Sequence, residues 1–250
     1  MNRKKLVTYL DNYLQIHDIK DYGPQGLQVE TGNDEINKIA IAVDVSPQIL
    51  HDVAEWGADM LLVHHGIFWG KQQVIAGALG ERVRLMMAHG INLYAAHLAL
   101  DAHTAVGNNA ILAEMFGLQE IEWWFAPMGT PLGVVGNVEK RPLGDLVSDI
   151  NQKLQTDSQV LDHGRAEVER LAILSGAGAG EVLAAKELGA DTYLTGETSH
   201  AQYWLAADYG MNVIFAGHYA TETVGVQALG EHLKEKFGVE TKFFDYPTQM

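Results

Sequence analysis

The spacing of hydrophobic positions changes repeatedly along the chain, and each spacing predicts an element. Apolar residues three and four positions apart predict helices, and short apolar runs rich in β-branched residues predict strands. The pattern predicts helices over residues 3–16, 49–56, 79–89, 107–116 and 143–154 and strands over residues 38–43, 60–63 and 91–96. This alternation predicts an α/β fold whose sheets are flanked by helices.

Two stretches of the chain recur in its second half. AEWGADMLLVHHG at residues 54–66 resembles AKELGADTYLTGETS at residues 185–199, and HGINLYAAHLALDAH at residues 89–103 resembles YGMNVIFAGHYATET at residues 209–223. A shared G-A-D turn can arise by chance, because such turns recur in α/β proteins. Two matches in the same order favour an internal duplication, which predicts two similar βαβ-containing lobes.

The duplication also predicts how the chain is divided. We expect a first α/β half at residues 1–121, an intervening segment at residues 122–167 and a second α/β half at residues 168–250. The intervening segment contains EWWFAPMGTPLG and one predicted helix, which suggests extra structure added to the duplicated pair.

Composition narrows the classes of function. The chain has 17 basic and 32 acidic residues, a formal charge of −15, which disfavours nucleic acid and anionic membrane surfaces as partners. Cysteine is absent, so any metal must be held by nitrogen and oxygen atoms. The N-terminal residues do not resemble a signal peptide, and no apolar run reaches the roughly 20 residues of a membrane span. We therefore expect a cytoplasmic protein.

Histidines and carboxylates gather where predicted strands end. His64 and His65 follow one strand, His97 and Asp101 follow the next, and the corresponding positions of the second half carry His218 and Glu222. The carboxyl ends of strands in an α/β sheet are where ligands bind. A single pair of histidines or a single His-x-x-x-Asp is more often structural, but three such clusters favour a metal site.

The number of donors favours two divalent ions over one. Hydrolytic metal pairs use several histidines together with carboxylates, and the ions activate a water molecule. Manganese, iron and zinc all accept nitrogen and oxygen ligands, so the sequence does not choose among them. Because the donors come from both halves, we expect the site between the two lobes.

Other residues near these clusters have two interpretations each. His97 and His103 could be catalytic proton shuttles or could orient a ligand, but hydrogen bonds within a turn explain them equally well. Glu197 occupies the repeat position of His65, and it could approach the site or cap a helix, as could the nearby His200.

Two further motifs each have two interpretations that the sequence does not separate. The aromatic segment Trp123, Trp124 and Phe125 could stack on a purine, although oligomer contacts or core packing are more common for such residues. LSGAGAGE at residues 174–181 could hold a phosphate, but it lacks the lysine of a P-loop, which favours a plain tight turn.

The chain resembles a known family along nearly its whole length. LLVHHGIFW, NLYAAHLALDAH, GNNA, LTGE, AGHYATE and the N-terminal YGPQGLQVE are similar to the YbgI-like family, often labelled GTP cyclohydrolase 1 type 2 homologues. The resemblance implies a dinuclear metal centre with Glu222 as the bridging carboxylate. It also implies a ring-shaped homohexamer whose metal sites face an internal cavity. The metal ligands that it implies are His64, His65, Asp101, His218 and Glu222.

These observations predict a metal-dependent hydrolase that acts on a small molecule. The family label implies attack on a purine ring carbon, and the same metals would serve phosphoester or amide hydrolysis. The alternative is a metal-binding ring that acts as a scaffold without turnover. A closed homo-oligomer is expected in either case, since a tryptophan-rich segment exposed near residues 121–130 would offer apolar surface for contacts.

Overall fold

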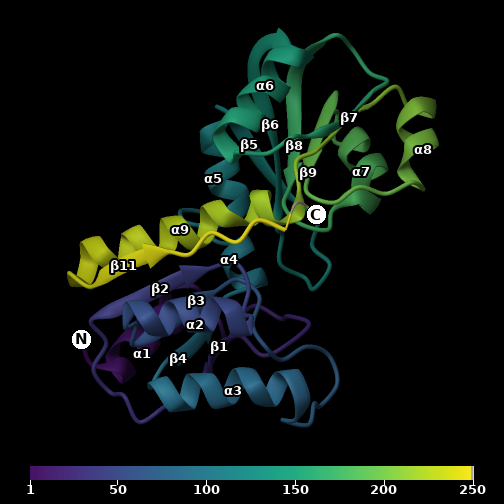
Figure 1. Ribbon diagram of the computed structural model, residues 1–250. Helices are drawn as coiled ribbons and strands as arrows, with labels where there is room; N and C mark the ends of the chain where they lie inside the picture. Colours follow the sequence, from purple (N-terminus) through teal and green to yellow (C-terminus); the bar gives the residue numbers. More distant parts are fainter. Residues whose placement is uncertain (249) are drawn as a thin grey trace. The chain divides into compact units, whose positions relative to one another are not determined.

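The computed structural model describes residues 1–248 and residue 250. The chain forms two compact units, each with its own sheet and hydrophobic core (Figure 1). The first unit comprises Met1–Val106 and Gly225–Tyr246, and the second comprises Gly107–Val224 and Pro247–Met250. The predicted α/β class with helices beside each sheet is confirmed.

The first unit contains a five-stranded sheet in the order β1-β4-β3-β2-β11. Strands β2, β3, β4 and β11 are parallel, and β1 runs antiparallel to β4. The strands are β1 (Gly26–Val29), β2 (Lys38–Ala42), β3 (Met60–Val63), β4 (Asn92–Ala95) and β11 (Glu240–Phe243). The helices are α1 (Arg3–Tyr13), α2 (Pro47–Trp56), α3 (Gly77–His89), α4 (Leu98–Asp101) and the later part of α9 (His218–Phe237).

The sequence of α2 explains both its ends and its packing. The Ser46 hydroxyl accepts a hydrogen bond from the Ile49 amide at 3.2 Å, and the following Pro47 suits the first helical position. The helix ends at Gly57, whose φ of 77° favours glycine. The buried side of α2 joins the core on one face of the sheet, where α3 also packs.

The second unit contains a six-stranded sheet in the order β5-β6-β8-β9-β10-β7. Strands β8, β9 and β10 are parallel, and the remaining pairings are antiparallel. The strands are β5 (Gln119–Trp124), β6 (Gly133–Pro142), β7 (Gln159–Asp162), β8 (Glu167–Leu174), β9 (Thr192–Thr195) and β10 (Asn212–Phe215). The helices are α5 (Asn108–Met115), α6 (Leu143–Leu154), the 3₁₀ turn η1 (Ala179–Glu181), α7 (Val182–Glu187), α8 (Gln202–Asp208) and the start of α9.

The segments that resemble each other in sequence make equivalent hydrogen bonds. Asp59 Oδ2 accepts from two backbone amides at the start of β2, at 2.7 and 2.9 Å, and Asp191 Oδ2 does the same at β8, at 2.9 and 3.0 Å. Gly57 and Gly189, two residues before each aspartate, both have positive φ, 77° and 81°. The two units therefore use one local design, and the duplication itself stays a prediction.

The units differ from the division at residues 121 and 167 that the repeats suggest. Segment 122–167 supplies β6 and β7, which pair with β8 and β10, so it is an integral part of the second sheet. Strand β11, from the predicted second half, pairs with β2 in the first sheet. These pairings join residues far apart in sequence, and hydrophobic periodicity carries no information about such partners.

The expected exposure of residues 121–130 holds in part. Exposed residues are Ile121, Glu122, Ala126, Pro127 and Gly129, whereas Trp124 is buried and Trp123 is half-buried. Trp124 is only 8% exposed, and its ring lies 6.0 Å from the Tyr193 ring, edge to face. Trp123 packs against the core of the second unit, whereas Ile121 is exposed. Strand alternation points Trp123 and Trp124 to opposite faces of the sheet, and each packs against other residues there. The homohexamer therefore stays a prediction that rests on the family resemblance.

Across residues 1–248 and 250, no helix has both the length and the apolar character that a membrane span requires.

Candidate metal site

His64 and His65 lie where β3 ends and the chain turns away from the sheet. Both backbone amides donate to the carbonyl oxygen of Val43, at 3.1 and 2.8 Å, so the strand pattern has already stopped. Side chains of consecutive strand residues point to opposite faces, but this turn brings the two rings to a centroid separation of 4.8 Å. His64 is completely buried, and His65 is partly exposed.

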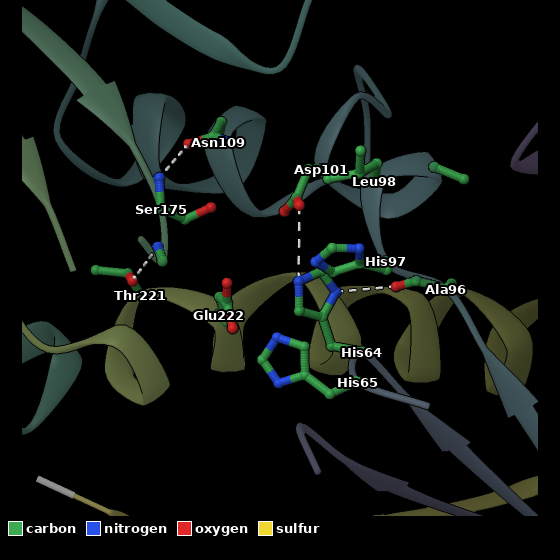
Figure 2. Close-up of polar contacts among 12 residues, drawn as sticks. His64, His65, Ala96, His97, Leu98, Asp101, Asn109, Ser175, Thr221 and Glu222 are labelled. Carbon is green, nitrogen blue, oxygen red and sulfur yellow. Dashed lines mark hydrogen bonds and ion pairs between the residues drawn. The ribbon is translucent and has the colours of Figure 1, made fainter. Parts of the chain in front are cut away.

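The His64 ring has a defined orientation (Figure 2). Its Nδ1 donates a hydrogen bond to the Ala96 carbonyl at 2.9 Å, and its Nε2 lies 3.6 Å from Asp101 Oδ2. A carbonyl oxygen can only accept, so the proton of a neutral His64 ring resides on Nδ1 and the lone pair on Nε2. Asp101 is 6% exposed, which places its carboxylate next to this lone pair in a buried environment.

Two further imidazoles repeat this arrangement in the first unit. His65 Nδ1 bonds to Asp44 Oδ1 at 2.9 Å, and His97 Nδ1 bonds to Asp21 Oδ1 at 2.8 Å. His64, His65 and His97 each offer a ring nitrogen within 4.8 Å of the others. Metal-ligating histidines are typically held in this way, with the second nitrogen bonded to a carbonyl or carboxylate oxygen.

The second unit contains a matching pair at the start of α9. His218 and Glu222 are four residues apart on the helix, and His218 Nε2 lies 3.0 Å from Glu222 Oε2. His218 Nδ1 lies 2.6 Å from Glu197 Oε1. Glu222 is 4% exposed. Glu197 thus contacts a predicted ligand, which agrees with its repeat position.

The charge state of His218 follows from these contacts. Burial lowers its pKa, but the carboxylates of Glu222 and Glu197 outweigh burial and raise the pKa to about 9. The ring is therefore protonated near neutral pH. A cation that binds this nitrogen must displace the proton, so metal affinity at this position should increase with pH.

The glycine-rich loop forms a wall beside Glu222. Gly176 has a φ of 67°, and a Cβ at this position would overlap Glu222 Oε1 and lie 3.3 Å from His218 Nε2. The loop is fixed on both sides, because Thr221 Oγ1 accepts from the Gly176 amide at 3.0 Å and Asn109 Oδ1 accepts from the Ser175 amide at 2.8 Å (Figure 2). The sequence singled out this loop as a turn or a phosphate site and missed its contact with Glu222.

The surroundings of His103 and His200, the other candidates from the sequence, do not indicate a role in metal binding. His103 Nε2 lies 3.1 Å from the Tyr13 carbonyl, and its Nδ1 accepts from two backbone amides at 3.2 Å. Burial lowers the pKa of His103, the Tyr13 carbonyl partly opposes this effect, and His232 adds to it. These contacts favour a turn-stabilising role. His200 is exposed in the loop before α8.

Asp21 and Asp44 were not identified from the sequence, although each holds a histidine of this cluster. Asp21 Oδ2 also accepts from the Leu98 amide at 2.9 Å, at the start of α4. Both aspartates lie in loops with no regular spacing to the histidines they contact. A possible signal is YGPQGLQVE, the turn that follows Asp21, but its glycines and proline indicate only a loop.

The fold and these contacts define a class of protein: an α/β protein of two sheets whose histidines and carboxylates could hold a metal ion. The chain belongs to the DUF34/NIF3 (NGG1p interacting factor 3) family, whose model matches residues 1–249. The resemblance to YbgI-like proteins is confirmed.

Curated relatives and solved structures match the whole chain. A GTP cyclohydrolase 1 type 2 homolog of Deinococcus radiodurans is 42% identical over 252 residues, covering 99% of this chain and 94% of that protein. TTHA1606 of Thermus thermophilus is 40% identical, with full coverage of both chains and a TM-score of 0.92. The protein ybgI, described as of unknown function, is 35% identical, with full coverage of both chains and a TM-score of 0.93.

Proposed function

We propose that this protein binds two divalent metal ions per chain and uses them to hydrolyse a small molecule. One observation carries the proposal: in each unit a histidine Nε2 faces a buried carboxylate while an oxygen atom holds its Nδ1. Histidines oriented in this way can donate the Nε2 lone pair to a cation, and at His218 the cation first displaces the proton that Glu222 and Glu197 hold on the ring. The proposed ligands are His64, His65, Asp101, His218 and Glu222.

The donor set suits the chemistry of transition metals. Imidazole nitrogen and carboxylate oxygen together fit manganese, iron or zinc, and no thiolate is available in the chain. When bound, such ions supply Lewis acidity, which lowers the pKa of water and polarises the bond to be broken. Asp101 and Glu222 supply negative charge to offset the cations, and Asp21, Asp44 and Glu197 hold the rings of His97, His65 and His218.

The hydrolytic part of the proposal is supported by the relatives. Curated proteins 41–42% identical to this chain carry the name GTP cyclohydrolase 1 type 2 homolog. This name points to hydrolysis of a bond at a ring carbon of a nucleotide. Phosphoester and cyclic amide substrates are compatible with the same donor set.

Turnover by metal-reconstituted protein tests this function. Protein loaded with manganese, iron or zinc is assayed against nucleotides, phosphoesters and cyclic amides, with metal content measured in every sample. His65→Ala should reduce the rate by more than about 100-fold, beyond the 10- to 100-fold typical of residues that only support a ligand. His51→Ala, an exposed histidine on α2, is the matched control and should retain the rate.

The assay separates the hydrolase from the scaffold. Sustained turnover that requires metal and His65 supports the hydrolase. Full metal occupancy with no turnover on any of the three substrate classes would overturn it in favour of a metal-binding ring.

A further inference from the structure

Exposed aromatic side chains gather on α8, which lies at the outer side of the second unit beside α7 (Figure 1). Trp204 is 68% exposed, Tyr203 is 40% exposed, and Tyr209, which directly follows the helix, is 46% exposed. The rings of Tyr203 and Trp204 meet edge to face, with their centroids 5.1 Å apart. Neighbouring apolar groups in contact with water mark interaction surfaces, whereas single exposed residues do not. We call these three residues and Asp208 the α8 face.

The second unit holds the α8 face in a fixed shape. The Tyr203 ring stands edge-on against the ring of His163, at 5.1 Å and 87°, and His163 directly follows β7. On the inner side of α8, Ala206 is completely buried. The Tyr209 amide donates to the Leu205 carbonyl at 3.1 Å, which fixes the end of the helix. A partner therefore meets rings that are already ordered, so little side-chain entropy is lost on binding.

The charge of the α8 face is negative. Asp208 follows Trp204 by four residues, so both side chains lie on one side of the helix, and Asp208 is exposed. In the part of the chain that the structure describes, the Asp208 carboxylate has no hydrogen bond and no ion pair. Helix α8 contains no basic residue. The second unit as a whole has 16 acidic and six basic residues, a formal charge of −10.

Most cations of the second unit are already paired with its carboxylates. Four of the six basic residues form such ion pairs, namely Lys140, Arg141, Lys153 and Arg170. Lys153 also lies over the Phe116 ring at 5.5 Å, whereas no lysine or arginine of the described residues lies over Trp204. The α8 face therefore combines exposed rings and an unpaired carboxylate with no cation to complement them.

Charge separates the candidate partners of the α8 face. Nucleic acid and anionic membranes would meet a negative surface and be repelled. A second copy that docked through the same face would bring Asp208 against Asp208, because a two-fold contact pairs each patch with itself. A guanidinium or ammonium group instead gains from both parts of the face, since cations bind the faces of indole rings and pair with carboxylates.

We propose that the α8 face binds a basic segment of another protein, with an arginine or lysine over the Trp204 ring and its charge beside Asp208. Tyr203 supports the indole ring from the side, and Tyr209 adds a second exposed phenol. None of these residues is a proposed metal ligand, so this binding does not depend on the proposed hydrolase.

Calorimetric titration with a peptide of alternating arginine and glycine, at about 150 mM salt, tests the proposal. The protein should bind this peptide saturably and bind its uncharged citrulline analogue at least about 5-fold more weakly. Trp204→Ala should weaken binding about 5-fold or more, and Trp204→Phe should weaken it less. Asp208→Asn should weaken it roughly 2- to 5-fold. Asp157→Asn, an exposed carboxylate of the same unit outside α8, is the control of equal charge and should retain the affinity.

The Trp204 variants separate the α8 face from the general attraction between a basic peptide and an acidic protein, because they leave the net charge unchanged. Unaltered binding by Trp204→Ala overturns the proposal, as does the absence of saturable binding. Equal losses in Asp208→Asn and Asp157→Asn contradict the role of Asp208. A lower mass of Trp204→Ala by light scattering would place α8 between copies of this chain and would also overturn the proposal. Circular dichroism checks that each variant is folded.

Discussion

Replacing Glu222 with glutamine is expected to remove both metal ions together. The amide keeps the size of the side chain but loses the negative charge, and one amide oxygen cannot offset two neighbouring cations as a carboxylate does. Metal content should therefore fall from about two ions per chain to about zero. His218→Ala should instead empty one position preferentially, because an imidazole nitrogen ordinarily donates to a single ion. Asp101→Asn should behave between these two variants.

Glu231→Gln provides the control on the same helix. Glu231 is an exposed residue of α9, 3.0 Å from Lys234, and its replacement should leave metal content unchanged. Elemental analysis of each variant, with folding checked by circular dichroism, gives the comparison. If Glu222→Gln keeps two ions at unaltered affinity, Glu222 is not a bridging ligand, and the site must be assigned around Asp101.

Gly176→Ala is expected to displace Glu222 without unfolding the second unit. The new Cβ would overlap Glu222 Oε1, and the end of a glutamate side chain can move away at small cost. The shifted carboxylate no longer faces His218 in the same way, so metal affinity should fall by at least about 10-fold, as when a supporting residue is lost. The backbone at φ 67° adds about 1–2 kcal/mol of destabilisation.

Gly117→Ala is the control that separates backbone destabilisation from displacement of Glu222. Gly117 has a similar φ of 72°, but a Cβ there would meet no atom within 4 Å. Its replacement should cost the same 1–2 kcal/mol in urea unfolding, a loss expected from the backbone alone, and should leave metal affinity unchanged. Equal metal affinity in the two variants would show that the glycine loop does not support Glu222.

The histidine clusters could be predicted from the sequence because the hydrophobic pattern shows where the strands end. Short apolar runs define β3, β4 and β10, and the histidines follow these strands directly. The contacts of these histidines with the carboxylates that hold their rings could not be predicted in the same way. Asp21 reaches His97 across 76 positions, and Asp44 reaches His65 across 21, through loops whose paths depend on tertiary packing. Only Glu197 could be suspected, from its repeat position.

The fold class was predictable for the same reason, and the pairing of strands was not. Parallel strands joined by helices follow from alternating periods, as in β2, α2 and β3. The return of β11 to the first sheet depends on pairing with β2, and the half-exposed pattern of residues 240–243 resembles any edge strand. The burial of Trp124 and the packing of Trp123 were not predictable, because aromatic content alone does not show what lies against each face of β5.

Metal stoichiometry tests the central claim most directly. Protein purified without chelator, then reconstituted with manganese, iron or zinc and freed of excess metal, should contain about two ions per chain by elemental analysis. A preparation that is folded by circular dichroism and never exceeds one ion per chain with any of these metals would contradict the paired site.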